Sequence, residues 1–349
     1  MKQLSSILLI CFAIIHSIYA QRGTDAVRVG DRQTIQAERL FNEGINLFSN
    51  GQFTESIQKF DESLKLYPNF ERALFNRAVA KKWTGDIQGA ITDFSRTIEL
   101  KPGMAKAYTG RGYARSHEDL EAALRDLNKA IELDNNQYQA YYYRGITYYS
   151  KNEFDLAIDD FSRTILLKAD HVYAYHDRGS AKKMNGDLYG ALADYQQAAF
   201  LDPGLYVVFN NIGMVKSEMG QYLDALGYFT TAINLHPNYA EAYNNRGIAR
   251  MYTGDIEASL SDLSKAIDIN SSYAEAYVNR GNSLYKSGEF HKAIDDYSQA
   301  ITLVPDYGAA YLNRGIAREM VRDPDGAYLD WEKAWELGVQ VAKDYLRNN

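Results

Sequence analysis

Small and large apolar positions return at a fixed interval along the chain. Glycine occupies one of these places at steps of 34 residues, with a single step of 33, and Ala78 fills the one gap. These glycines are Gly44, Gly112, Gly145, Gly179, Gly213, Gly247, Gly281 and Gly315. A fixed period of this length is typical of a stack of similar helical or strand-turn units and not of one globular core.

Within each period the apolar residues follow helical spacing in two blocks that are separated by a turn. In the seventh period the pattern predicts helices over 240–252 and 256–269, joined by Thr253-Gly254-Asp255. Each block is about three turns long, which is marginal for an isolated helix in water. We therefore expect helical hairpins that are stable because they stack on one another.

Small and bulky residues alternate at fixed places in the period. The twentieth place is Ser or Ala throughout, and the twenty-fourth place is bulky, from Phe60 to Trp331. This alternation lets two facing helices interdigitate. Proline follows the second block at Pro68, Pro102, Pro203, Pro237 and Pro305. At that place it stops the helix from continuing.

The length of the period and the Gly, Ala, aromatic and Pro places resemble the tetratricopeptide repeat. The resemblance covers nine units over residues 37–341. It implies an all-α fold, a right-handed α-solenoid superhelix of about nine helix-turn-helix units. Residues 342–349 form the C-terminal cap or tail, and we expect a short helix over 339–346 to cover Trp331 and Trp335.

The first 20 residues have the layout of a secretory signal peptide. Lys2 precedes an apolar run over 7–15, and Ala20 comes before Gln21. We expect cleavage after Ala20 and an exported protein, in the periplasm or in the outer envelope or extracellular space. An uncleaved membrane anchor stays the alternative. Residues 21–36 show no clear periodicity and are interpreted as a linker.

Composition and charge narrow the possible functions. The only cysteine, Cys11, lies inside the apolar run, so the exported chain would have no disulfide, as in bacterial envelope proteins. The formal net charge is −7 and no polybasic run occurs, which disfavours a nucleic-acid partner. The sequence contains no nucleophile motif, phosphate-binding loop or paired helical histidines. We therefore expect no enzyme activity, no cofactor and no metal.

One charge pair follows the repeat. Seven units carry Arg at the seventh place and Asp at the twenty-third, as in Arg77 with Asp93 and Arg246 with Asp262. The first unit reverses the signs, with Glu43 and Lys59. We predict an ion pair between the two helices of each of these units. The alternative is a row of arginines that binds an acidic ligand.

In this family the first helices line the inner surface, where extended peptides bind. The sixth place is asparagine in six units: Asn42, Asn76, Asn211, Asn245, Asn279 and Asn313. Each amide offers donors and an acceptor, so the row can hold a peptide backbone. Asparagine that merely suits a half-exposed site is the open alternative. The fifth place has no lysine, which excludes a carboxylate clamp of the chaperone-tail type.

Aromatic residues concentrate at or near the inward places of the middle units. The candidate ligand contacts are Tyr113, Tyr142, Tyr149, Tyr173 and His176. Tyrosine combines contact area with a hydrogen-bonding tip, which suits peptide or sugar. Packing of these rings in the core is the open alternative.

We expect a non-enzymatic scaffold that binds extended peptide segments of a protein partner in its concave groove. The stretch from Gly326 to Gly338 resembles envelope tetratricopeptide proteins of the Bacteroidetes kind, which suggests envelope complex assembly or secretion. The alternatives are a subunit that binds a glycan or cell-wall fragment and an accessory subunit of a separate enzyme. Contact with a membrane is expected only through partners or an uncleaved signal, and the oligomeric state is open.

Overall fold

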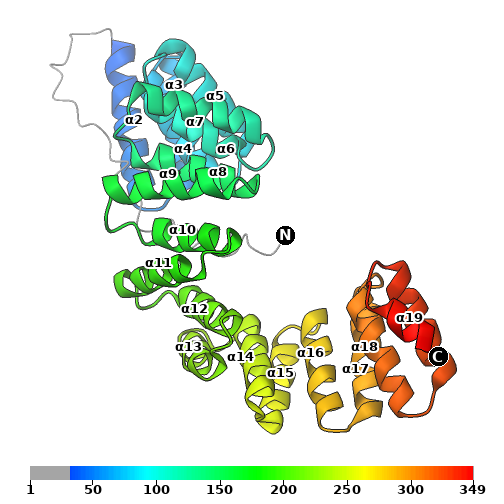
Figure 1. Cartoon of the computed structure of the whole chain (residues 1–349). Coiled ribbons are helices and arrows are strands. Elements are labelled where there is room, and N and C mark those ends of the chain that lie inside the picture. Colours follow the sequence, from blue (N-terminus) through cyan, green and yellow to red (C-terminus); the bar gives the residue numbers. More distant parts are fainter. Residues whose placement is uncertain (1–31, 349) are drawn as a thin grey trace. The chain divides into compact units, whose positions relative to one another are not determined.

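The computed structural model describes residues 32–348, and within this range all secondary structure is helical (Figure 1). The 19 helices of these residues are α2 (Arg32–Ser49), α3 (Phe53–Leu66), α4 (Glu71–Trp83), α5 (Ile87–Leu100), α6 (Ala105–Arg115), α7 (Leu120–Leu133), α8 (Tyr138–Ser150), α9 (Phe154–Leu167), α10 (Val172–Met184), α11 (Leu188–Leu201), α12 (Tyr206–Glu218), α13 (Tyr222–Leu235), α14 (Ala240–Thr253), α15 (Ile256–Ile269), α16 (Ala274–Lys286), α17 (Phe290–Leu303), α18 (Gly308–Met320), α19 (Pro324–Glu336) and α20 (Ala342–Asn348).

The helices pair as hairpins, and the hairpins stack in chain order. The chain divides into two compact parts, an N-terminal part that ends at Gly186 and a C-terminal part that begins at Asp187. In the N-terminal part α2 packs on α3, α4 on α5, α6 on α7 and α8 on α9. In the C-terminal part α12 packs on α13, α14 on α15, α16 on α17 and α18 on α19. The prediction of an all-α solenoid of helix-turn-helix units is confirmed.

The periodic glycine lets the two helices of a hairpin approach closely. A Cβ atom added to Gly145 would lie 2.8 Å from the Phe161 ring, and one added to Gly213 would lie 2.5 Å from the Phe229 ring. Both phenylalanines are buried. Any larger residue at these glycines would push the ring out of its place, so the repeat of glycine reports helix packing.

Aspartate begins the second helix of several hairpins. Oδ1 of Asp255 accepts a hydrogen bond from the backbone N–H of Ala258 at 3.2 Å, which satisfies one of the free donors at the start of α15. Gly254, just before it, has a φ of 90°, a conformation that glycine adopts without strain. The same cap occurs at Asp86, Asp119, Asp187 and Asp323.

The predicted arginine–aspartate pairs form inside the hairpins. Nε and Nη2 of Arg144 each lie 2.7 Å from an oxygen of Asp160, and this carboxylate is buried. The same two-point contact joins Arg77 to Asp93, Arg111 to Asp126, Arg246 to Asp262, Arg280 to Asp296, and Arg314 to Asp330.

Two predicted pairs lie outside this set. In the first repeat Lys59 Nζ lies 3.5 Å from Glu43 Oε2, so the reversed pair also forms. Arg178 and Asp194 lie in different parts of the chain, and their pairing stays a prediction.

Each arginine also reaches back to the preceding hairpin. Nη1 of Arg246 donates to Thr230 Oγ1 at 3.0 Å, and Nη1 of Arg144 donates to Asn128 Oδ1 at 2.6 Å. Arg314 contacts Ser298 in the same way. The guanidinium groups therefore join neighbouring repeats, and this internal use disfavours a role as a row that binds an acidic ligand.

The N-terminal end of the repeat region differs slightly from the expected boundary. Helix α2 begins at Arg32, so residues 32–36, which the sequence assigned to a linker, are helical. The side chains of these residues are mostly exposed, including Ile35. This segment therefore has no apolar face to bury, and its sequence lacks the apolar periodicity that marks a packed helix. The expected signal peptide over 1–20 lies outside the described residues.

A short helix covers the last hairpin, as predicted. Helix α20 begins at Ala342, and the ring of Tyr345 lies 5.0 Å from the ring of buried Trp331. Lys343 Nζ lies 5.2 Å from the ring of Trp335. Among the residues that the structure describes, no helix has both the length and the apolar character needed to cross a membrane.

The buried pair can be tested by neutralising one carboxylate. We expect Asp160→Asn to lower the free energy of unfolding by about 3 kcal/mol, because it leaves the half-buried Arg144 guanidinium without its counter-charge. Asp159→Asn, at the exposed neighbouring position, is the matched control and should change stability little. Urea unfolding followed by circular dichroism measures both. Equal effects of the two substitutions would contradict the assigned role of the pair.

Candidate functional site

The first helices of the middle repeats bring several candidate residues together in the N-terminal part. Tyr142, on α8, is only 3% exposed, and its ring lies among those of Phe161 and His171, at centroid distances of 5.9 and 4.6 Å. Its place in the repeat faces the second helix of the same hairpin. This burial favours the open alternative for Tyr142, packing of its ring in the core, over a direct contact with a ligand.

The hydroxyl group of Tyr142 fixes a carboxylate that sequence reasoning missed. It donates a hydrogen bond of 2.8 Å to Oδ2 of Asp177, on α10. Nδ1 of His176 lies 2.8 Å from the other oxygen, Oδ1, and 27% of the Asp177 side chain is exposed. Asp177 occupies the sixth place of its repeat, where six other repeats carry asparagine. This aspartate at a place that usually carries asparagine was the feature of the sequence that could have identified it.

Three half-buried tyrosines belong to the packed group from which Tyr142 reaches this carboxylate. Tyr143, Tyr149 and Tyr173 pack against the buried cluster that contains Tyr142 and Phe161. Burial and the nearby Asp177 carboxylate raise the pKa of Tyr149, so its hydroxyl stays protonated. The structure thus brings Tyr149 and His176 close to one acidic group, and Tyr173 packs against the same core.

Tyr113, on α6, joins the same aromatic group at its edge. Its ring lies 4.5 Å from that of Tyr143, and Lys82 Nζ lies 4.4 Å from the Tyr113 ring centroid. The predicted aromatic residues of the middle repeats therefore form one connected set. We call Asp177, His176, Tyr143, Tyr149 and Tyr173 the acidic aromatic cluster.

His171 holds in place the helix that carries Asp177. Its Nδ1 accepts a hydrogen bond from the backbone N–H of Ala174 at 3.0 Å and so caps α10, which carries Asp177. Burial, with a smaller contribution from Lys168, lowers the pKa of His171 from 6.5 to about 4. The imidazole is therefore neutral near pH 7, as an acceptor must be.

The asparagines of the C-terminal part bond to one another across repeats. Asn245 Nδ2 donates to Asn210 Oδ1 at 3.0 Å, and Asn279 Nδ2 donates to Asn244 Oδ1 at 2.9 Å. Asn244 Nδ2 in turn donates to Asn245 Oδ1 at 3.2 Å. These four amides form a continuous chain over α12, α14 and α16, which we call the amide ladder.

The ladder combines two adjacent places of the repeat. Asn210 and Asn244, at the fifth place, are buried, whereas Asn245 and Asn279, at the sixth, are half-buried. The predicted row of ligand contacts included only asparagines of the sixth place, so it left out the two buried partners at the fifth. Each amide can make about four hydrogen bonds, so the half-buried members keep donor and acceptor capacity for a ligand.

The other four predicted asparagines are not members of the amide ladder. Asn313 Nδ2 donates to Asn282 Oδ1 at 3.0 Å, and Asn211, on α12, is half-buried. In the N-terminal part Asn76 Nδ2 donates to the carbonyl of Arg72 in its own helix, and Asn42 is exposed. The structure does not place Asn42 and Asn76 in the amide ladder.

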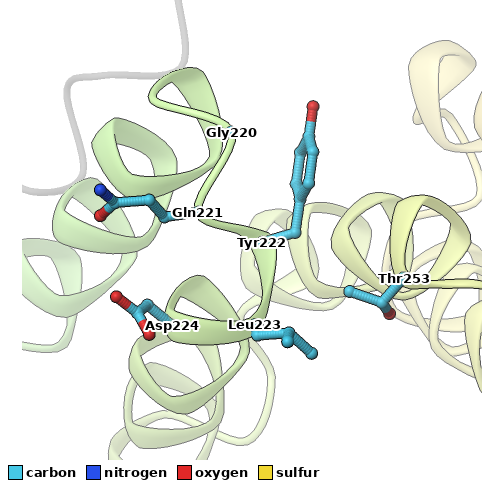
Figure 2. A pocket seen from close by; sticks show the side chains of 6 residues that line it. All are labelled: Gly220, Gln221, Tyr222, Leu223, Asp224 and Thr253. Atoms are coloured by element: carbon cyan, nitrogen blue, oxygen red, sulfur yellow. The ribbon is translucent and has the colours of Figure 1, made fainter.

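A surface hollow of the C-terminal part includes no residue of the amide ladder. It is lined by Gly220, Gln221, Tyr222, Leu223, Asp224 and Thr253. Figure 2 shows its residues around the turn between α12 and α13, with Gln221 and Asp224 on the opposite side from Thr253. It contains none of the candidate residues. Within residues 32–348 no group of three or more His, Cys, Asp or Glu side chains is arranged to hold a metal ion.

Comparison with known proteins identifies the repeats. Models described as tetratricopeptide repeats match residues 37–70, 113–171, 249–288 and 274–307. The chain thus contains tetratricopeptide repeats over these residues. Proteins built from these repeats mediate protein–protein interactions and are generally non-catalytic.

Relatives match over short stretches. Human tetratricopeptide repeat protein 36 is 35% identical over 75 residues, which cover 22% of this chain and 40% of the relative. Hsp70-Hsp90 organizing protein 3 of Arabidopsis thaliana is 30% identical over 76 residues, which cover 22% of this chain and 14% of the relative. The matches thus span less than half of these relatives.

A solved structure extends the likeness of fold. The crystal structure of the APC/C hetero-tetramer Cut9-Hcn1 matches 89% of this chain and 62% of its own, with a TM-score of 0.58. Its sequence identity is 15%, so the comparison supports the solenoid fold alone.

The buried histidine makes stability depend on pH. The pKa of His171 is about 4 in the folded chain and 6.5 without burial, so between these values the unfolded state binds more protons. Its contribution is fully present above pH 6.5 and is lost as the pH falls toward 4. We expect a loss of about 3 kcal/mol that is absent from His171→Gln, which copies Gln137 at the equivalent place.

The measurement is urea unfolding of the wild-type chain and of His171→Gln at several values from pH 7 to pH 4. His117→Gln, at an exposed histidine, is the control and should keep the wild-type pH dependence. A wild-type slope that persists in His171→Gln would assign the effect to other groups.

Proposed function

We propose that this protein is a non-enzymatic scaffold that binds extended peptide segments along the first helices of its repeats. The observation that carries the proposal is the amide ladder of the C-terminal part. It sets Asn245 and Asn279 at equivalent places of consecutive repeats, each held by a buried partner amide. Fixed amides can donate to and accept from a peptide backbone, whatever the sequence of that peptide.

Preorganisation makes this arrangement suitable for binding. A free asparagine side chain loses rotamer freedom when it binds, whereas Asn245 is already held at both its oxygen and its nitrogen. The backbone of an extended peptide presents donors and acceptors at a regular spacing. The family supports the general role in protein interaction, and the ladder supports backbone recognition as its mode.

A role in the cell envelope is part of the same proposal. It rests on the signal-like layout of residues 1–20 and on the likeness of the C-terminal repeat to Bacteroidetes envelope proteins. We propose export to the periplasm or outer envelope, and work there in complex assembly or secretion. The acidic aromatic cluster would suit a glycan as a second candidate, because aromatic faces and a carboxylate both contact sugar hydroxyls.

The export proposal predicts the N-terminus of the mature chain. When the full sequence is produced in a Gram-negative host, we expect the protein in the envelope fraction to begin at Gln21, as measured by intact mass. Recovery of only the uncleaved chain from the cytoplasmic fraction would contradict export.

The peptide-binding proposal predicts a loss of affinity when the ladder is cut. We expect Asn245→Ala/Asn279→Ala to weaken a peptide selected on the full chain by about 30-fold, since two hydrogen bonds contribute about 2 kcal/mol together. Isothermal titration calorimetry measures the affinity. Circular dichroism checks that the variant is folded at the assay temperature.

The matched control is Asn234→Ala/Asn238→Ala. These asparagines are exposed on the second helix and in the following loop of a hairpin of the same part. The control should bind the peptide as the wild-type chain does. If the ladder variant also binds as tightly as wild type, the ladder is not the binding surface.

A further inference from the structure

The acidic aromatic cluster holds its carboxylate in a fixed orientation. Tyr142 is buried and its hydroxyl donates to Oδ2 of Asp177 at 2.8 Å, while Nδ1 of His176 lies 2.8 Å from Oδ1. Tyr142 is itself wedged against His171, which caps the helix that carries Asp177. The position of this charge is therefore determined by core packing and by a helix cap.

The carboxylate keeps room for a ligand. An ionised carboxylate accepts about four hydrogen bonds, and the contacts with Tyr142 and His176 use one site on each oxygen. More than a quarter of the Asp177 side chain, 27%, is exposed. A donor from outside can thus reach Asp177 without displacing the tyrosine that fixes it.

The rings of the acidic aromatic cluster favour a positively charged donor, and that of Tyr149 is close enough for the Asp177 carboxylate to raise its pKa. Tyr143, Tyr149 and Tyr173 are half-buried on α8 and α10 and belong to the same packed group. Aromatic faces attract ammonium and guanidinium groups, and they also pack against the methylene chains of Lys and Arg. A cation near Asp177 would gain from the carboxylate and from the rings together.

The place of Asp177 in the repeat indicates which kind of ligand group it selects. Six other repeats carry asparagine here, and an amide can bond to both the N–H and the C=O of a peptide. A carboxylate only accepts, so it repels a peptide carbonyl and selects a donor. Hydrogen bonds from charged donors are the strongest of these.

We propose that Asp177 and the tyrosines of the acidic aromatic cluster form a subsite for one lysine or arginine side chain of the bound peptide. This inference rests on the proposed function, because it assigns part of the peptide's side-chain specificity to the N-terminal part. The net charge of −7 also attracts a basic peptide segment, which agrees with this choice of side chain.

The first experiment selects peptides without assuming a sequence. A phage library of random 12-residue peptides is panned on the full chain and, in parallel, on Asp177→Asn. We expect the peptides selected by the wild-type chain to share a Lys or Arg at one position, and those selected by Asp177→Asn to lose this preference. Asn Oδ1 can still accept from the Tyr142 hydroxyl, so the melting temperature of the variant should stay close to that of wild type.

The second experiment removes the charge from the ligand. A selected peptide is compared by calorimetry with its counterpart in which citrulline replaces arginine, or norleucine replaces lysine. We expect the wild-type chain to bind the charged peptide at least tenfold more tightly and Asp177→Asn to bind both alike. The control Asp170→Asn neutralises an exposed carboxylate nearby in the chain and should keep the discrimination.

Each outcome decides between the two proposals. Selected peptides without a shared basic residue, or a charge preference that survives in Asp177→Asn, would overturn the subsite and leave peptide binding intact. Failure to select any peptide above background, with binding of soluble glycan instead, would overturn the peptide scaffold and the subsite with it.

Discussion

The contact on which the repeats depend is the buried pair between an arginine of the first helix and an aspartate of the second. Its two parallel hydrogen bonds fix the angle of the hairpin, and the third nitrogen of the guanidinium bonds to the preceding hairpin, as Arg246 does with Thr230. One side chain therefore sets the register within a repeat and between repeats. The inward asparagines can form a ladder because Arg246 and Arg280 hold α14 and α16 against the hairpins that precede them.

The sixth repeat shows how the same place can be filled without charge. There Ile212 replaces the arginine and is 1% exposed, and Tyr228 stands at the place of the aspartate. Replacing a buried ion pair with apolar residues of similar volume is often neutral for stability. Both partners change together, as expected if a single charge left in this position would be costly.

Much of this fold could be predicted from the sequence because the constraint repeats. The predicted helix over 256–269 matches α15, and the one over 240–252 ends one residue before α14 does. The first boundary was less accurate, since residues 32–36 form helix without burying an apolar face. The candidate site was harder, because tyrosine suits both core and surface. The burial of Tyr142 depends on the ring of Phe161 across the hairpin, and the role of Asn244 depends on Asn279 of the next repeat.

The two candidate surfaces suggest a division of recognition. The amide ladder offers neutral donors and acceptors, which suit a peptide backbone, and the acidic aromatic cluster offers a fixed charge, which suits one side chain. Backbone contacts supply affinity for many segments, and a charge contact selects among them. A scaffold with both would bind a class of extended segments that share a basic residue.

Site-specific photocrosslinking tests the central claim, that peptides lie along the first helices, most directly. A benzophenone amino acid is placed singly at Asn313 or Tyr149 on first helices, or at Leu166 or Leu329, which are exposed on second helices. Each full chain is irradiated with a selected, biotin-labelled peptide. The account predicts crosslinks from Asn313 and Tyr149 and none from Leu166 or Leu329. Crosslinks confined to the two leucine positions would contradict it.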